Sequence, residues 1–224
     1  KGSRGEGAAH RCACFPAPIG GAFHPVADPA PDAVRSFAPP LAPAPNVVDT
    51  SIDEETVRRI AQTQISVPEG FHVHPKLLPQ LIKRAAMIND GTIDWSMGET
   101  LAFGSLLLEG KPIRLAGQDS RRGTFSNRHA VIIDKEDGSE WTPLRGLISD
   151  ENQLFVIDSL LSEYAAMGFE YGYSVARDEA LVLWEAQFGD FGNGAQTIVD
   201  EFISSALQKW GERSGVVLLL PHGY

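Results

Sequence analysis

The sequence has few cysteines, little positive charge and no long apolar run. Its 224 residues include two cysteines, and 19 Lys and Arg stand against 29 Asp and Glu, for a formal net charge of −10. This charge argues against nucleic acid and against an anionic membrane as partners, because both bind basic surfaces. No apolar run approaches the roughly 18 residues of a membrane span, and we expect no signal peptide.

The two cysteines do not form a recognisable framework. Cys12 and Cys14 are separated by one residue, a spacing that suits neither a disulfide scaffold nor a paired zinc motif. We interpret them as reduced thiols, and together with the composition they predict a cytoplasmic protein. The sequence begins at Lys1 and stops within a motif, so we expect it to be part of a longer chain.

Composition divides the chain into three parts. Residues 1–50 are rich in Ala, Pro and Gly, which predicts a linker or a disordered segment. Residues 51–90 carry two stretches with helical spacing, near 53–64 and 77–89, and form a predicted helical lead-in. Asp53 is a candidate cap for the first of these helices. Residues 91–224 form the predicted main domain.

The main domain opens with a predicted buried helix that runs to about Glu109 and is closed by Gly110. Two caps are possible for its start: a capping box formed by Ser96 and Glu99, or Asp94. Residues 111–117 then read as a strand that enters a polar loop, residues 118–127. Loops at the carboxyl ends of parallel strands are where α/β sheets place ligand contacts.

The remainder of the domain alternates between helical and strand patterns. Residues 161–173 have an apolar stripe at helical spacing, which predicts a buried face made of Leu161, Ala165, Gly168, Phe169 and Gly172. Residues 181–184 and 215–220 read as strands covered on both faces. Between them, residues 197–207 predict a helix that turns Ile198, Phe202 and Leu207 inward. Alternating helices and strands of these lengths predict an α/β fold with a parallel sheet.

The polar loop has the composition of a binding site. Gln118 offers an amide, Arg121 and Arg122 offer guanidinium groups that fit a carboxylate, and His129 titrates near neutral pH. The alternative is that the two arginines pair with the acidic residues that this chain has in excess.

Glu163 is the residue that we single out as a candidate acid or base. Ser162 or Ser159 can cap a helix that begins beside it, and this places the carboxylate at the positive end of the helix dipole. Apolar neighbours oppose its ionisation. The alternative is an ordinary solvated glutamate in the first turn of a helix.

Four motifs carry a resemblance to a known family. They are GQDSRRGTFSNRHA at 117–130, LSEYAAMGFEYGY at 161–173, WEAQFGDF at 184–191 and LLPHGY at 219–224. Together, and in this order, they resemble the E1 component of 2-oxoglutarate dehydrogenase. More narrowly, the sequence from about Phe71 to Tyr224 is similar to the actinobacterial multifunctional 2-oxoglutarate decarboxylase/dehydrogenase group.

The resemblance implies a fold and a cofactor. The fold is the transketolase-like pyrimidine-binding domain, a three-layer arrangement with a parallel sheet and helices on both faces, here truncated at its C-terminal end. The cofactor is thiamine diphosphate, whose pyrimidine ring is activated by a glutamate that matches Glu163. Phe188 or Phe191 is the candidate for stacking on that ring. Gln118 is assigned to cofactor or substrate contact, and His129 to substrate contact.

The resemblance also indicates what this sequence lacks. The family holds Mg²⁺ and the diphosphate with a Gly-Asp-Gly run followed by Asn, and no Gly-Asp-Gly occurs here. We therefore assign no metal ligand. In the family, the pyrimidine and diphosphate halves of the site come from different subunits of a homodimer.

The implied activity is the oxidative decarboxylation of 2-oxoglutarate, with transfer of the succinyl group to a lipoyl carrier. The implied partners are the lipoyl-bearing acyltransferase E2, the dihydrolipoyl dehydrogenase E3 and a small 2-oxo acid. One alternative is an E1 relative that acts on another 2-oxo acid or transfers a ketol group. Another is that the fragment alone is a non-catalytic interaction module.

Overall fold

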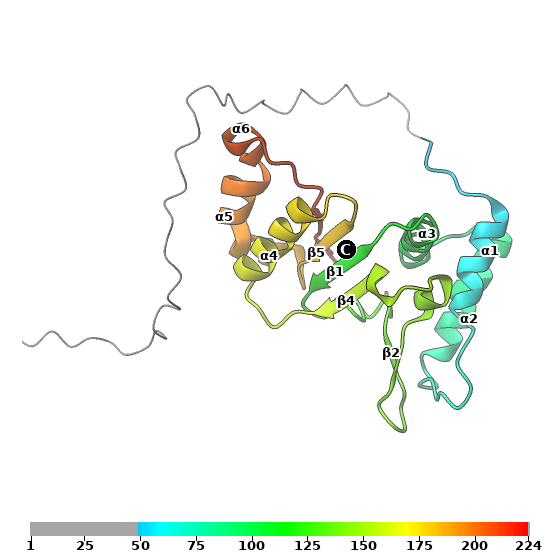
Figure 1. Cartoon of the computed structure of the whole chain (residues 1–224). Coiled ribbons are helices and arrows are strands. Elements are labelled where there is room, and N and C mark those ends of the chain that lie inside the picture. Colours follow the sequence, from blue (N-terminus) through cyan, green and yellow to red (C-terminus); the bar gives the residue numbers. More distant parts are fainter. Residues whose placement is uncertain (1–48, 224) are drawn as a thin grey trace, which may run out of the picture. The chain divides into compact units, whose positions relative to one another are not determined.

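The structure is a computed structural model and describes residues 49–223 (Figure 1). The Pro/Ala-rich segment predicted over residues 1–50 lies outside the described residues except for its last two, and so do Cys12 and Cys14. The helices have the bounds α1 Glu54–Thr63, α2 Leu78–Asp90, α3 Trp95–Leu108, α4 Glu163–Ala176, α5 Gln196–Ile198 and α6 Ala206–Trp210. The strands are β1 Ile113–Gly117, β2 Ile132–Ile133, β3 Glu140–Trp141, β4 Leu154–Asp158, β5 Leu181–Glu185 and β6 Val217–Leu219.

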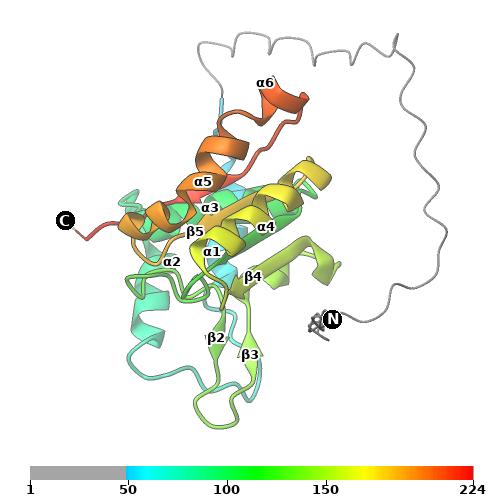
Figure 2. The same ribbon diagram turned by 90° about the vertical axis from the view of Figure 1, so that its left-hand side faces the viewer.

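Four strands form a parallel sheet in the order β4-β1-β5-β6. The strands predicted at 111–117 and 181–184 are β1 and β5, whereas β4 was not predicted. The strand predicted within residues 215–220 is β6, but the expectation that it is covered on both faces is wrong, because β6 is an edge strand and Val217 is exposed. A separate antiparallel hairpin, β2–β3, extends away from the sheet (Figure 2).

Helices cover both faces of the sheet, which confirms the predicted three layers (Figure 1). One apolar cluster joins α1 and α3 to one face and includes Ile60, Phe103, Leu115 and Leu183. A second cluster joins α4, α5 and α6 to the other face around Trp184. Burying one such aliphatic side chain stabilises a fold by about 1.5–3 kcal/mol. None of the helices in residues 49–223 has the length and apolarity needed to cross a bilayer.

The start of α3 shows which of its two candidate caps is used. Asp94 is the cap, since its carboxylate accepts the Met97 N–H at 2.8 Å. The capping box is wrong, because the Glu99 carboxylate binds the guanidinium of Arg128 instead. Asp53 caps α1 as predicted, and Gly110 follows α3 in the left-handed conformation that a helix end favours.

The buried face predicted for α4 is wrong. The residues turned inward are Ala166, Met167, Glu170, Tyr171 and Ser174. The predicted stripe, apart from the half-buried Gly168, faces outward, and Leu161 and Phe169 are 52% and 55% exposed. Both stripes have helical spacing. The contact with Trp184 of β5 turns inward the stripe that contains Ala166 and Met167. We refer to the outward residues Leu160, Leu161, Tyr164, Ala165 and Phe169 as the α4 outer face.

The helix predicted over residues 197–207 is divided by a π-helical turn, Val199–Ile203, between α5 and α6. Ile198 is buried and Phe202 packs on the same cluster, as predicted. Leu207 is 41% exposed and Ala206 is buried in its place. A π-turn adds a residue to the turn and changes the phase of all later side chains, so a constant helical period fails beyond it.

A buried cluster of charges connects the loop after β1 to two elements of the domain. The guanidinium of Arg128 donates to Glu185 at the end of β5 and to Glu99 on α3, at 2.5 Å in the latter case. The guanidinium of Arg84 on α2 donates to the carbonyl oxygens of Arg128 and Asn127. The side chains of Arg128, Glu99 and Glu185 are each at most 10% exposed.

We predict that Arg128→Ala strongly destabilises the domain. The substitution leaves two carboxylates buried without their cation, and breaking a buried pair in this way costs about 3–5 kcal/mol. Arg58→Ala is the control, because its partner Glu54 is exposed and a surface pair contributes about 0–1 kcal/mol. Urea unfolding of both variants measures the difference. Equal losses of unfolding free energy would contradict the prediction.

Candidate functional site

The carboxyl ends of three strands meet at one edge of the sheet. Gly117 at the end of β1 is in register with Asp158 of β4 and with Glu185 of β5. Gly117 approaches its neighbour closely, since a Cβ there would lie 2.0 Å from the Glu185 carbonyl oxygen. The segments that leave these strands therefore begin side by side, which is the usual place for ligand contacts in a parallel sheet.

Glu163 is the first residue of α4 and follows β4 at this edge. Ser162 occupies the N-cap position, but neither serine caps the first turn as predicted. The Ser162 side chain makes no capping bond, and the Ser159 hydroxyl accepts the Leu161 N–H before the helix begins. The Glu163 carboxylate is half-buried and lies where the N-terminal dipole of α4 favours negative charge.

Gln118, the first residue after β1, contacts this carboxylate. Its side-chain amide donates to Oε1 of Glu163 at 3.2 Å. The two residues border a narrow cleft whose other walls include the buried Trp184 and Ala186. The structure thus brings together two residues that sequence analysis selected 45 positions apart.

A 3₁₀ segment, η3 Gly189–Ala195, closes over the start of α4. A Cβ on Gly194 would lie 3.3 Å from Oε2 of Glu163, so the missing side chain permits this close approach. Sequence analysis did not select Gly194. The repeated glycines at 189, 192 and 194 are the only local signal that could have indicated it.

Phe188 and Phe191 lie after β5 at the same edge, as the sequence order requires. Their ring centroids are 6.2 Å apart, and Phe188 also contacts Phe125 edge-on at 5.7 Å. Phe188 is 41% and Phe191 is 49% exposed, so both rings have free surface. Among the described residues, their aromatic ring contacts are with one another and with Phe125.

The arginines of the loop pair with acids of this chain, as in the alternative considered above. Arg122 binds Asp119 at 2.6 Å, and Arg121 binds Glu140 at 2.6 Å. Asp119 also accepts the Gln187 amide at 2.8 Å, so this residue, which sequence analysis missed, links the loop to the segment after β5. The backbone of Asp119 is left-handed, with a φ of +56°, and no sequence pattern reveals this conformation.

His129 is not brought to Glu163. It has a left-handed backbone, with φ +49°, and its N–H donates to the Arg122 carbonyl. No hydrogen bond within residues 49–223 joins it to Gln118 or Glu163. Burial lowers the pKa of His129 from its ordinary 6.5, and the charges of Arg84 and Arg122 lower it further. The same residues contain no group of three His, Cys, Asp or Glu side chains arranged for a metal ion.

The lowered pKa of His129 predicts a pH dependence of stability. Below about pH 6.5 the unfolded chain binds a proton that the folded chain resists, so stability falls as the pH falls. His129→Asn keeps a residue that tolerates positive φ and removes the titration. Between about pH 7 and pH 5, the variant should lose less unfolding free energy than the parent chain in urea denaturation. An identical pH slope would contradict this.

Comparison with known proteins places the chain. Residues 91–224 match the family described as transketolase, pyrimidine binding domain. Curated proteins named "Multifunctional 2-oxoglutarate metabolism enzyme" are similar to this chain: one from Mycobacterium sp. (strain JLS) is 54% identical over 186 residues, and one from Mycolicibacterium vanbaalenii is 53% identical. The alignments cover 80% of this chain and 15% of each relative. The chain therefore spans a small part of these relatives, and it belongs to the transketolase pyrimidine-binding domain family.

Proposed function

We propose that this chain is the pyrimidine-binding part of a 2-oxoglutarate dehydrogenase E1 enzyme that uses thiamine diphosphate. The contact between Gln118 and Glu163 at the carboxyl edge of the sheet carries the proposal. At this contact the Glu163 carboxylate is half-buried and the Gln118 amide orients it. The segment η3 covers the carboxylate and limits its access to water. The names of the 2-oxoglutarate metabolism relatives support the choice of substrate.

The residues present suit the pyrimidine half of the cofactor. Glu163 would hold a proton at a pyrimidine ring nitrogen, with Gln118 fixing the direction of its carboxylate. Phe188 or Phe191 would stack on the ring, since both have free aromatic surface. Thiamine diphosphate, when bound, would supply a nucleophilic carbon and an electron sink for the decarboxylation of a 2-oxo acid. The described residues do not suit a Mg²⁺ site, so we assign the metal and the diphosphate to another part of the enzyme.

We further propose that the enzyme is a homodimer in which the α4 outer face contacts a second copy. The face is apolar, and its Leu160 is fully exposed. It begins within one turn of Glu163, so a partner on this face would lie beside the cofactor half-site. From the family resemblance, the proposal includes the lipoyl-bearing E2 and the E3 dehydrogenase as partners of the enzyme. From the composition, it includes a cytoplasmic location.

We predict that Glu163→Gln in the full-length enzyme abolishes most thiamine-dependent decarboxylation of 2-oxoglutarate. A positioned acid or base contributes about 10²–10⁴-fold to rate, and the amide cannot exchange the proton. Glu55→Gln is a matched control, because it is also an acid in the first turn of a helix. Retained turnover in Glu163→Gln would refute the role. Assays with pyruvate and a sugar phosphate test the choice of substrate.

We predict that Leu160→Glu weakens the homodimer of the full-length enzyme. A carboxylate within an apolar interface loses its hydration without gaining a partner, so sedimentation velocity should show a shift from dimer to monomer. Ile82→Glu is the matched control, because Ile82 is an exposed aliphatic residue on α2. A dimer that resists Leu160→Glu, or one disrupted equally by both variants, would exclude the α4 outer face as the interface.

A further inference from the structure

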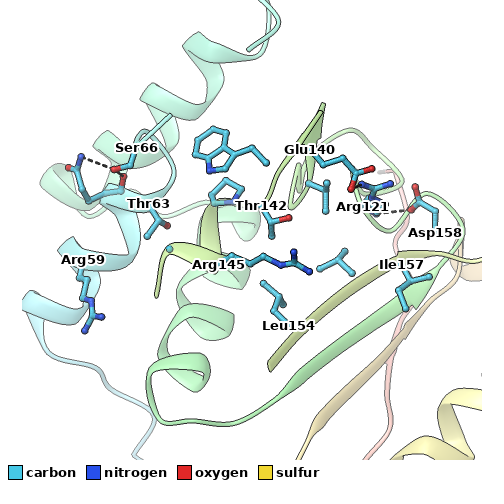
Figure 3. A pocket seen from close by; sticks show the side chains of 16 residues that line it. Arg59, Thr63, Ser66, Arg121, Glu140, Thr142, Arg145, Leu154, Ile157 and Asp158 are labelled. Carbon is cyan, nitrogen blue, oxygen red and sulfur yellow. Dashed lines mark hydrogen bonds and ion pairs between the residues drawn. The ribbon is translucent and has the colours of Figure 1, made fainter. Parts of the chain in front are cut away.

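A second cavity lies beside β4, the edge strand of the sheet (Figure 3), and shares no lining residue with the Glu163 cleft. Its volume is about 680 Å³, and it is an open pocket lined by residues of α1, β3, β4, the loop after β1 and the 3₁₀ segment η1 Pro143–Leu147. None of Gln118, Glu163, Phe188 and Phe191 lines it. Ligand cavities in proteins usually measure about 300–1,000 Å³, so its size suits a small molecule.

Arg145 lies at the centre of this cavity. Its side chain extends through the middle, between Thr142 and Leu154, whereas the side chain of Arg59 points away (Figure 3). Arg145 is exposed, and within residues 49–223 its guanidinium makes no ion pair and no hydrogen bond. The chain has 29 acidic residues, yet none of those described pairs with this cation.

Two other charged side chains of the cavity, Arg121 and Glu140, are paired with each other. Arg121 binds Glu140 at 2.6 Å, and the Arg121 N–H donates to Asp158 at 2.9 Å. The hydrogen bond from Arg121 holds the pKa of Glu140 below its ordinary value, and the charges of Arg121 and Arg145 add to this effect. Glu140 is therefore an ionised carboxylate that is already paired with Arg121, and the Arg145 guanidinium keeps its donors for another acceptor.

The chemistry around Arg145 indicates what that acceptor is. A guanidinium group binds carboxylate or phosphate oxygens through two parallel hydrogen bonds. The Thr142 hydroxyl borders the same space and has no hydrogen bond within residues 49–223, so it can donate to the same anion. Apolar side chains on one face of β4, Leu154 and Val156, line one wall and can cover an uncharged part of a ligand.

We propose that this cavity binds a small anionic molecule, whose carboxylate or phosphate group is held by Arg145 and Thr142. The cavity is larger than an inorganic anion, so the natural ligand is an organic acid or an organic phosphate that rests on the apolar wall of β4. The proposal is independent of thiamine diphosphate and of the reaction assigned above.

Titration of the 224-residue chain with inorganic phosphate and, separately, with citrate tests the proposal. Arginine side-chain NMR signals report the contact directly. We expect saturable binding of at least one anion, and the better binder distinguishes a phosphate from a carboxylate ligand. Arg145→Ala should weaken that binding at least about tenfold, since a charge-assisted bidentate pair is lost. Arg145→Lys, which keeps the charge without the fork, should give an intermediate loss.

Two controls make the result specific. Arg58→Ala removes an exposed arginine of α1 that lies outside the cavity and pairs with Glu54, and it should bind the anion as the parent chain does. Arg59→Ala should have less effect than Arg145→Ala, because its side chain points away (Figure 3). Circular dichroism verifies that each variant is folded. No saturable binding of either anion, or equal binding by folded Arg145→Ala, would overturn the proposal.

Discussion

The parallel pairing of β1 with β4 and β5 is the constraint on which the candidate site depends. It aligns Gly117 with Asp158 and Glu185, so that Gln118 emerges beside the segment leading to Glu163. A shift of one residue would turn each side chain of β1 to the opposite face and would separate this pair. Gly117 helps to fix the register, because any larger residue would collide with the carbonyl oxygen of Glu185.

The long connection from β1 to β4 contains no α-helix, so it needs another source of order. Arg128 supplies it by binding Glu99 on α3 and Glu185 on β5, while Arg84 binds carbonyl oxygens of the connection. Burial raises the pKa of Glu185, and Arg128 opposes that shift. Because a half-formed arrangement would leave a charge buried without a partner, the cluster favours one position of the loop over its alternatives.

Much of the fold could be predicted because its elements have strong local signals. The start of α4 at Glu163, the strands β1 and β5 and the cap at Asp53 all follow from short patterns. Features set by tertiary contact could not be predicted. Two stripes on α4 satisfy the same helical spacing, and packing on β5 turns inward the one that includes Glu170 and Ser174. A π-turn after Ile198 changes the phase that a regular period assumes.

The candidate site shows the same division between local and tertiary information. Gln118 and Glu163 were selected from the family motifs, and their proximity follows once the parallel register is known. The roles of Gly194 and Asp119 depend on what lies opposite them in space, and the sequence offers only a repeat of glycines as a signal for Gly194. His129 was selected from its chemistry and its motif, yet its backbone conformation and its burial direct it to a different environment.

The apolar stripe that α4 leaves exposed bears on how the site works. One helix carries the carboxylate at its first residue, packs on β5 with one side and leaves an apolar stripe on the other. Packing within the domain removes part of the water around the carboxylate of Glu163. The remaining water would be displaced only when a second subunit covers the α4 outer face. Subunit association on the α4 outer face and the exposure of Glu163 to water would therefore be coupled through a single helix.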